Sequence, residues 1–185
     1  MGLISQSNLE AKLGRILTTV EKNAYPFIAD AIIRYVEAYT GVSLTSTDTT
    51  SRYYDGGVQH LKIAPCTDIT KIELVDDYMT VVYEYLTSDY QTEPSHKTLK
   101  TMLRHRSGAF VTGLNNIKVT AKFSIAGDTE SLAIVKYAIL EALVSELGNM
   151  DNITQESIEG YSVSYGNEKT IDVISSIKYL FPEVM

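Results

Sequence analysis

The N-terminal part of the chain carries apolar side chains at helical spacing. A first helix is predicted over Ser7–Val20, where a serine and a glutamate three residues later have the spacing of a capping box. A second helix is predicted over Pro26–Thr40, because proline suits a first helical position and Gly41 is a natural left-handed stop. The apolar positions that define the two helices are Leu9, Leu13, Ile16, Leu17 and Val20, and then Ile28, Ala31, Ile32, Tyr35, Val36 and Tyr39.

The pattern changes to that of β-strands between Arg52 and Ile125. The sequence Asp55-Gly56-Gly57 is typical of a turn and predicts a hairpin between the strands that flank it. The clearest strand is Ile117–Ile125, where apolar and polar side chains alternate, which indicates one buried side and one solvent-facing side. The predicted hairpin strands are Arg52–Tyr54 and Val58–Ile63, and the further strands are Ile69–Val75, Val81–Leu86 and Leu99–Leu103.

A third helix is predicted over Thr129–Leu147, with Gly148 at its end. Its apolar side chains extend well beyond one face, as expected of a helix that is central in the fold or shared between subunits. The candidate inter-subunit residues on this helix are Ile134, Ala138 and Val144.

The remaining C-terminal residues contain two short patterns. Residues 161–165 alternate like a strand, and Thr170–Phe181 returns to helical spacing before Pro182. Helical and strand blocks are segregated along the chain, which predicts an α+β fold. We expect a helical bundle of two N-terminal helices, one long central helix and a C-terminal helix, with an antiparallel β-rich insertion over residues 52–125. Residues 1–150 are expected to form the core, and residues 151–185 an arm.

Composition narrows the function classes. The 185 residues, 44% hydrophobic and 21% charged, are typical of a soluble globular protein, and no stretch reaches the roughly 18 apolar residues of a membrane span. A net charge of −7 repels phosphate, so general DNA affinity is not expected. The single cysteine, Cys66, excludes an internal disulfide and favours assembly in a reducing cytoplasm. The 13 tyrosines suit protein–protein interfaces, although core tyrosines are equally ordinary.

The residues of enzyme and metal sites do not occur in the necessary patterns. His60, His96 and His105 lack the spacing of a metal motif. Residues 160–164 resemble a nucleophile elbow but lack its second glycine, and Ser175 with Lys178 lacks the companion motifs of a serine–lysine site. The sequence has neither a phosphate-binding loop nor a dinucleotide fingerprint. We therefore expect no enzymatic activity, no cofactor and no metal.

One basic cluster has two interpretations. It comprises Lys97, Lys100, Arg104, His105 and Arg106. These residues can contact nucleic acid or an acidic neighbour, or they can be a solvated loop and strand edge whose charges prevent edge-to-edge pairing. The acidity of the chain favours the second interpretation.

Three stretches of the chain together carry a resemblance to a known family. The second helix ends in Val36-Glu37-Ala38-Tyr39-Thr40-Gly41, and an Ala64-Pro65 turn precedes the strand at Ile69–Val75. The most specific stretch is residues 156–166, which read ESIEGYSVSYG. With these stretches the sequence resembles the head–tail connector proteins of tailed bacteriophages, also called adaptor or head-completion proteins, whose tails similarly carry Glu-Ser-Ile and then Tyr-Ser-Val-x-Tyr before a short terminal helix. The likeness covers both ends and the third helix, whereas the β insertion matches only longer members of the family.

The resemblance implies a structural virion protein at the head–tail interface, assembled in the host cytoplasm. Such proteins form a homo-oligomeric ring, commonly of twelve subunits, beneath the portal protein, and the ring's other side receives a stopper or tail-completion protein. DNA passes through the lumen during ejection without sequence-specific binding. By this likeness the C-terminal segment docks on the portal, through Ile158, Tyr161, Val163, Tyr165, Ile174, Ile177, Leu180 and Phe181.

Two alternatives remain open at this point. One is another neck or tail-completion protein of the same kind of particle. The other is a small nucleic-acid-binding regulator that uses the first two helices and the basic cluster, and it would show salt-dependent binding to duplex DNA.

Overall fold

The computed structural model describes residues 3–153, which fall into two compact units. A helical unit is formed by the residues up to Thr40 and from Glu130 onward, and a sheet unit by residues 41–129. The mixed α+β class is confirmed. The helical-bundle description fits poorly, because the described residues contain three helices, one of which has only eight residues, beside a six-stranded sheet.

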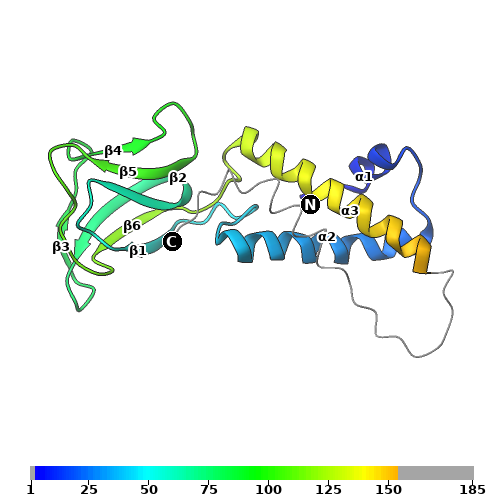
Figure 1. Cartoon of the computed structure of the whole chain (residues 1–185), viewed down its shortest axis with the longest axis horizontal. Coiled ribbons are helices and arrows are strands. Elements are labelled where there is room, and N and C mark those ends of the chain that lie inside the picture. The colour runs from blue at the N-terminus through cyan, green and yellow to red at the C-terminus, as the bar shows by residue number, and fades with distance from the viewer. Residues whose placement is uncertain (1–2, 154–185) are drawn as a thin grey trace. The chain divides into compact units, whose positions relative to one another are not determined.

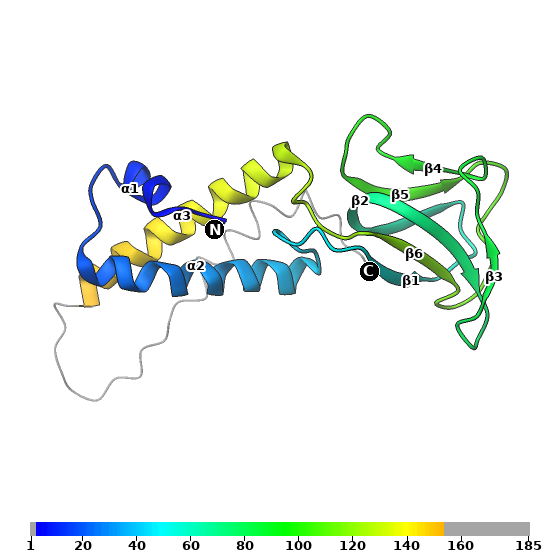
Figure 2. The same ribbon diagram turned by 180° about the vertical axis from the view of Figure 1, so that it is seen from behind.

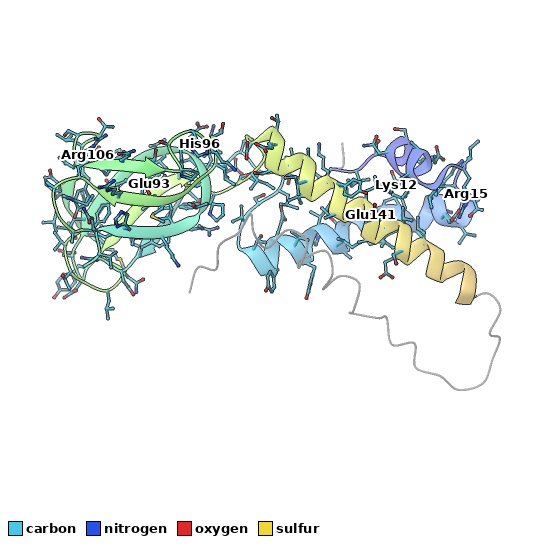
Figure 3. All side chains as sticks on the ribbon, turned by 45° about the horizontal axis from the view of Figure 1, so that its top comes forward. Lys12, Arg15, Glu93, His96, Arg106 and Glu141 are labelled. Carbon is cyan, nitrogen blue, oxygen red and sulfur yellow. The ribbon has the colours of Figure 1, made fainter. Side chains whose placement is uncertain are left out.

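The helical unit contains α1 (Gln6–Leu13), α2 (Thr19–Thr40) and α3 (Thr129–Ile153). Helices α2 and α3 lie side by side and run in opposite directions (Figures 1 and 2). Lys12 of α1 joins α3, where its Nζ lies 2.5 Å from Glu141 Oε1 and 4.7 Å from the centre of the Tyr137 ring. Figure 3 shows Lys12 and Glu141 pointing toward one another. The buried side chains of the three helices include Leu9, Ala29, Ile32, Val36, Val135, Ile139, Leu143 and Leu147.

The prediction of a single helix over Ser7–Val20 is wrong. Helix α1 begins at Gln6, one residue earlier than expected, with Ser5 as its N-cap, and it ends before Gly14, whose φ of 69° glycine adopts easily. The predicted capping box of Ser7 and Glu10 does not form, because the Ser5 side chain accepts from the amide of Asn8 and caps the helix. The Glu10 carboxylate accepts hydrogen bonds from Gln6 Nε2 and from the amide of Leu17.

Helix α2 starts at a capping box that the sequence analysis did not identify. Thr18 Oγ1 accepts from the amide of Glu21 at 3.3 Å, and a Glu21 carboxylate oxygen accepts from the amide of Thr18 at 2.7 Å. Arg15 holds the same carboxylate through two hydrogen bonds of 2.8 and 2.6 Å. This network starts the helix at Thr19, so Pro26 lies inside α2 instead of at its first position.

We expect Glu21→Gln to lower the free energy of unfolding at pH 7 by about 2 kcal/mol, with the exposure of Arg15 limiting the effect. The Arg15 guanidinium lowers the pKa of Glu21 from 4.5 to about 2. A lowered pKa stabilises the folded state above the unfolded pKa, and this contribution is lost as the pH falls through the folded one. The difference between variant and wild type should therefore vanish between pH 4.5 and 2 in urea unfolding. Glu130→Gln, an exposed carboxylate in α3, is the control.

The sheet unit contains β1 (Thr50–Tyr54), β2 (His60–Val75), β3 (Val81–Glu84), β4 (Tyr90–Glu93), β5 (Lys100–His105) and β6 (Ile117–Lys122). The strand order is β1-β6-β2-β5-β4, with β3 paired to β2, and every pair is antiparallel. The N-terminal half of β2 pairs with β5, and its C-terminal half pairs with β6 and β3. The buried residues of the sheet include Leu61, Ile63, Cys66, Ile72, Leu103, Ile117, Val119 and Ala121.

Two strand predictions are wrong. Residues 55–57 do not turn a hairpin, because β1 pairs with β6 over Thr50–Tyr54, and Gly56 and Gly57 instead bond to Gly113 and Phe110. The predicted strands Val58–Ile63 and Ile69–Val75 are not separated by an Ala64-Pro65 turn, since the single strand β2 runs from His60 to Val75. The hairpin across residues 76–80 and the strand at Ile117 are confirmed, with β6 ending at Lys122.

Strand β4 was not predicted, and α3 continues past Gly148 to Ile153. A single glycine in a helix costs only about 1 kcal/mol, which the packing of neighbouring turns can offset. The predicted strand at residues 161–165 and the predicted helix Thr170–Phe181 lie outside the described residues.

Candidate interaction surfaces

Neither an enzymatic nor a metal site is assembled in the part of the chain that the structure describes. No group of three or more His, Cys, Asp or Glu side chains among residues 3–153 could hold a metal ion. Burial raises the pKa of the Cys66 thiol to about 12, so this cysteine is not a thiolate at neutral pH. The serines of the two weak catalytic patterns, at 162–164 and 175, lie outside the described residues. None of the described helices has the length and apolar character needed to cross a membrane.

A groove of about 370 Å³ in the helical unit also lacks reactive groups. It is lined mainly by apolar residues of the N-terminal segment and α2, and its ionisable residues are Tyr25 and Asp30. Asp30 accepts a hydrogen bond from Arg34 Nε at 2.7 Å. A paired carboxylate beside a phenol is not a catalytic constellation.

Helix α2 is apolar on two opposite faces. One face is buried and carries Ala29, Ile32 and Val36. About half a turn around the helix, at positions that recur every four or seven residues, a second set of side chains is exposed. This set, the outer stripe of α2, consists of Val20, Phe27, Ala31, Tyr35 and Ala38, and Phe27 is 78% exposed. The sequence analysis placed Ala31 and Tyr35 on the same stripe as Ile32, and the structure separates them, since Ile32 is buried and both others are exposed.

The β2–β3 hairpin is a second exposed apolar surface. Strand β3 is exposed at all four positions, and Tyr78 at the tip of the hairpin is 89% exposed. We define the hairpin surface as Tyr78, Met79, Val82 and Leu86 with the carboxylates of Asp77 and Glu84; all six side chains are exposed.

Hydrogen bonds order the hairpin surface although its side chains are not buried. Asp76 Oδ1 accepts from the amides of Tyr78 at 2.9 Å and Thr80 at 2.8 Å, which fixes the turn. Asp89 Oδ2 accepts from the Tyr83 hydroxyl at 3.0 Å and from the amide of Leu86 at 2.8 Å. The Leu86 bond and then the Tyr83 bond lower the pKa of Asp89, so the carboxylate stays ionised. A preordered surface loses less entropy on binding.

The predicted basic cluster does not come together as one surface. Lys100 Nζ donates to the carbonyls of Pro94 and Ser95, and Arg106 Nε donates to the Tyr90 carbonyl at 3.0 Å. The ring of His105 packs edge-on against Phe110, with ring centres 5.3 Å apart. Figure 3 shows His96 and Arg106 at different ends of β5. Of the five predicted residues, Lys97 and Arg104 are the two exposed cations whose side chains make no such hydrogen bond to a backbone carbonyl. They do not form one surface, because Arg104 lies with residues of β2 on one side of the sheet.

Arg104 lies on a face of the sheet that the sequence analysis missed. His60 is directly opposite Arg104 and Lys62 is directly opposite Met102 in the β2–β5 pair, so all four side chains share one side of the sheet. His60, Lys62 and Arg104 are exposed. We call these four residues the basic face. The alternation of exposed His60 and Lys62 with buried Leu61 and Ile63 was the signal available in the sequence.

The other predicted interaction residues divide in two groups. Ala138 is buried, whereas Ile134 and Val144 are half-buried on α3. The eight predicted portal-docking residues, from Ile158 to Phe181, lie outside the described residues.

Comparisons with known proteins are informative only at the level of structure. No protein-family model matches the sequence, and no curated protein matches it significantly. A chain from a structure described as the neck of an empty GTA particle computed with C6 symmetry has a TM-score of 0.50 at 14% identity, covering 96% of this chain and 88% of that chain. A chain from the neck of a native GTA particle computed with C12 symmetry has a TM-score of 0.45 at 14% identity, covering 84% and 80%. A chain from the virion of a native gene transfer agent has a TM-score of 0.39 at 17% identity, covering 81% and 75%. At these identities the first likeness is one of fold alone.

Proposed function

We propose that this protein is a non-enzymatic structural component of the neck of a phage-like particle. It forms a ring, of twelve copies by its resemblance to connector proteins, between the portal and the tail or stopper protein. The ring seals the neck and forms part of the channel for DNA. The protein acts through the surfaces that it offers to copies of itself and to virion partners.

The fold likeness supports the class of assembly. The neighbour with a TM-score of 0.50 comes from a particle neck computed with C6 symmetry, and a symmetric neck is built from repeated copies around an axis. A closed ring of identical chains requires a heterologous interface, in which two different surfaces of each subunit match one another. A chain in such a ring must therefore expose more than one binding surface.

The observation that carries the proposal is that α2 has two apolar faces. The core of the helical unit needs only the face of Ala29, Ile32 and Val36. Phe27 on the opposite face removes little apolar area from water within the chain, since it is 78% exposed. Large exposed apolar side chains gathered on one helix mark an interaction site, and buried aromatic anchors dominate such interfaces. In the proposed ring the outer stripe is covered by a neighbouring subunit or a neck partner.

The arm and α3 complete the proposal. Residues 151–185 form the arm that docks on the portal through its eight predicted apolar and aromatic residues. The half-buried side chains of Ile134 and Val144, with Ala138 between them, contribute to contacts between subunits.

The test is incorporation of the protein into necks assembled on the portal, observed by electron microscopy. Phe27→Glu should abolish incorporation while leaving the free energy of unfolding within about 0.5 kcal/mol of wild type, because the side chain is exposed. A chain that ends at Gln155 should fold but no longer bind the portal. Ala11→Glu, which adds the same charge at an exposed position of α1, should incorporate normally. Normal incorporation of Phe27→Glu would show that the outer stripe is not part of the assembly.

The exposed side chains of the basic face favour one alternative function, that of a nucleic-acid-binding protein. His60, Lys62 and Arg104 lie together on the sheet, as a small nucleic-acid-binding protein would require. Duplex DNA binding that weakens steeply with salt would support this alternative, and the absence of binding at low salt would eliminate it.

A further inference from the structure

Charges of the two signs occupy separate stretches of the sheet unit. Residues 72–95 contain no Lys, Arg or His, and residues 96–127 contain no Asp or Glu. The carboxylates of the first stretch are Glu73, Asp76, Asp77, Glu84, Asp89 and Glu93, and the cations of the second are Lys97, Lys100, Arg104, Arg106, Lys118 and Lys122.

Ion pairs within the sheet unit neutralise only some of these charges. Glu73 Oε2 lies 2.8 Å from Lys118 Nζ, and Lys122 pairs with Asp68 at 2.8 Å. Glu84 has a weaker partner in Lys71, 3.8 Å away. Within residues 3–153, no ion pair is present at Asp77 on the hairpin surface or at Lys62 and Arg104 on the basic face.

The two surfaces lie at opposite ends of one strand. The basic face is built on the first residues of β2, at His60 and Lys62, and the hairpin surface follows its last residue, Val75. The span from Lys62 to Val75 is at most roughly 40 Å for an extended strand. The chain after β3 approaches the end of β5, where the rings of Tyr85 and His105 lie 5.9 Å apart. The hairpin tip, with Tyr78 and Met79, follows the far end of β2 and is exposed, so it can contact another copy.

We propose that the hairpin surface of one copy binds the basic face of the next copy, so that the sheet units associate head to tail. The chemistry of the two surfaces is complementary. Asp77 and Glu84 meet Lys62 and Arg104, the Tyr78 ring stacks against a cationic head group, and Met79 packs on Met102 and the aliphatic stem of Lys62. Glu93, opposite Met102 in the β4–β5 pair, is the carboxylate at the edge of the basic face.

This inference rests on the proposed ring, because a head-to-tail contact between two different surfaces is the kind of interface that a ring requires. It also excludes pairing of like surfaces, since two hairpin surfaces would place carboxylates against carboxylates.

The experiment uses two double variants of the full chain. Asp77→Lys with Glu84→Lys makes both surfaces basic, and Lys62→Glu with Arg104→Glu makes both acidic. Asp76 and Asp89 are left unchanged because they order the hairpin. Sedimentation velocity over rising protein concentration should show self-association of the wild type that weakens with salt, and at least about tenfold weaker association of each variant alone.

The decisive sample is an equimolar mixture of the two variants. A basic hairpin surface then meets an acidic face, and an acidic hairpin surface meets a basic face, so alternating copies should recover association close to wild type. Matching urea midpoints would show that all variants fold. If the Lys62→Glu with Arg104→Glu variant does not fold, the milder pair Lys62→Gln with Arg104→Gln replaces it. A wild type that stays monomeric up to its solubility limit, or a mixture no better than its components, would overturn the proposal.

The same samples separate this inference from the proposed function. Recovery in the mixture without incorporation into necks would support the contact and contradict the neck role. Neck incorporation by both variants alone would support the neck role and overturn the contact. If the Lys62→Glu with Arg104→Glu variant self-associates normally but loses salt-dependent duplex DNA binding, the basic face is a nucleic-acid site and the proposed contact is wrong.

Discussion

Gly56→Ala is expected to destabilise the sheet unit by more than about 4 kcal/mol, the largest effect of any single methyl group that we predict. A Cβ at this position would lie 1.8 Å from the carbonyl oxygen of Val111 and 2.9 Å from Asn116 Oδ1. The backbone cannot move away without loss of the hydrogen bonds that Gly56 makes to Gly113 and to Asn116. These bonds hold the segment after β1 against the segment before β6, so the added methyl group would push these two segments apart.

The measurement is urea unfolding followed by circular dichroism, with Gly108→Ala as the matched control. A Cβ at Gly108 would have no heavy atom within 4 Å, so this variant should unfold within about 0.5 kcal/mol of wild type. Equal stability of the two variants would mean that residues 56 and 111 do not approach each other as described.

Phe110→Ala should lower the free energy of unfolding by about 3–5 kcal/mol, because it removes a buried ring and leaves a cavity. The side chain is 1% exposed. Its ring packs edge-on against Tyr85 and His105, with both centres 5.3 Å away. Tyr85 also contacts Tyr83, so the cavity opens beneath the strand that carries the hairpin surface.

The same variant therefore tests whether the hairpin depends on this aromatic cluster. Near-ultraviolet circular dichroism should lose tyrosine signal in Phe110→Ala and retain it in Leu114→Ala, whose side chain is 82% exposed. Phe110→Leu should recover part of the stability, since it refills much of the volume. A Phe110→Ala chain as stable as Leu114→Ala would contradict the burial described for this ring.

The surfaces of the helical unit and of the sheet unit differ in chemistry. The outer stripe of α2 is apolar, and Asp30 and Arg34 of the same helix pair with one another. The hairpin surface and the basic face carry charge of opposite sign, and Asp77, Lys62 and Arg104 have no ion pair within residues 3–153. Apolar contacts supply affinity with little orientation, whereas charge patterns fix register and exclude wrong partners. A ring that uses both would be held by the helical unit and aligned by the sheet unit.

The sequence predicted elements wherever the local period was decisive. The long apolar stripe of α3 and the alternation of β6 identified both elements, because burial of one face imposes a period that only one secondary structure satisfies. The lack of residues at the spacings of known catalytic motifs could also be read from the sequence. The start of α2 could have been predicted, since Thr18 and Glu21 have capping-box spacing, but the apolar run through Val20 favoured one longer helix.

The sequence by itself determined the α+β class, the segregation of helices from strands and the position of the strand-forming block. Only the tertiary structure decided which strands pair, because β1 joins β6 across some sixty residues and the Gly56-Gly57 turn signal is satisfied by a distant backbone instead of by a hairpin. It also decided which of two similar apolar faces of α2 is buried and which cations share a side of the sheet. Pairing and burial depend on contacts between residues far apart in the chain, and local period and turn chemistry carry no information on those partners.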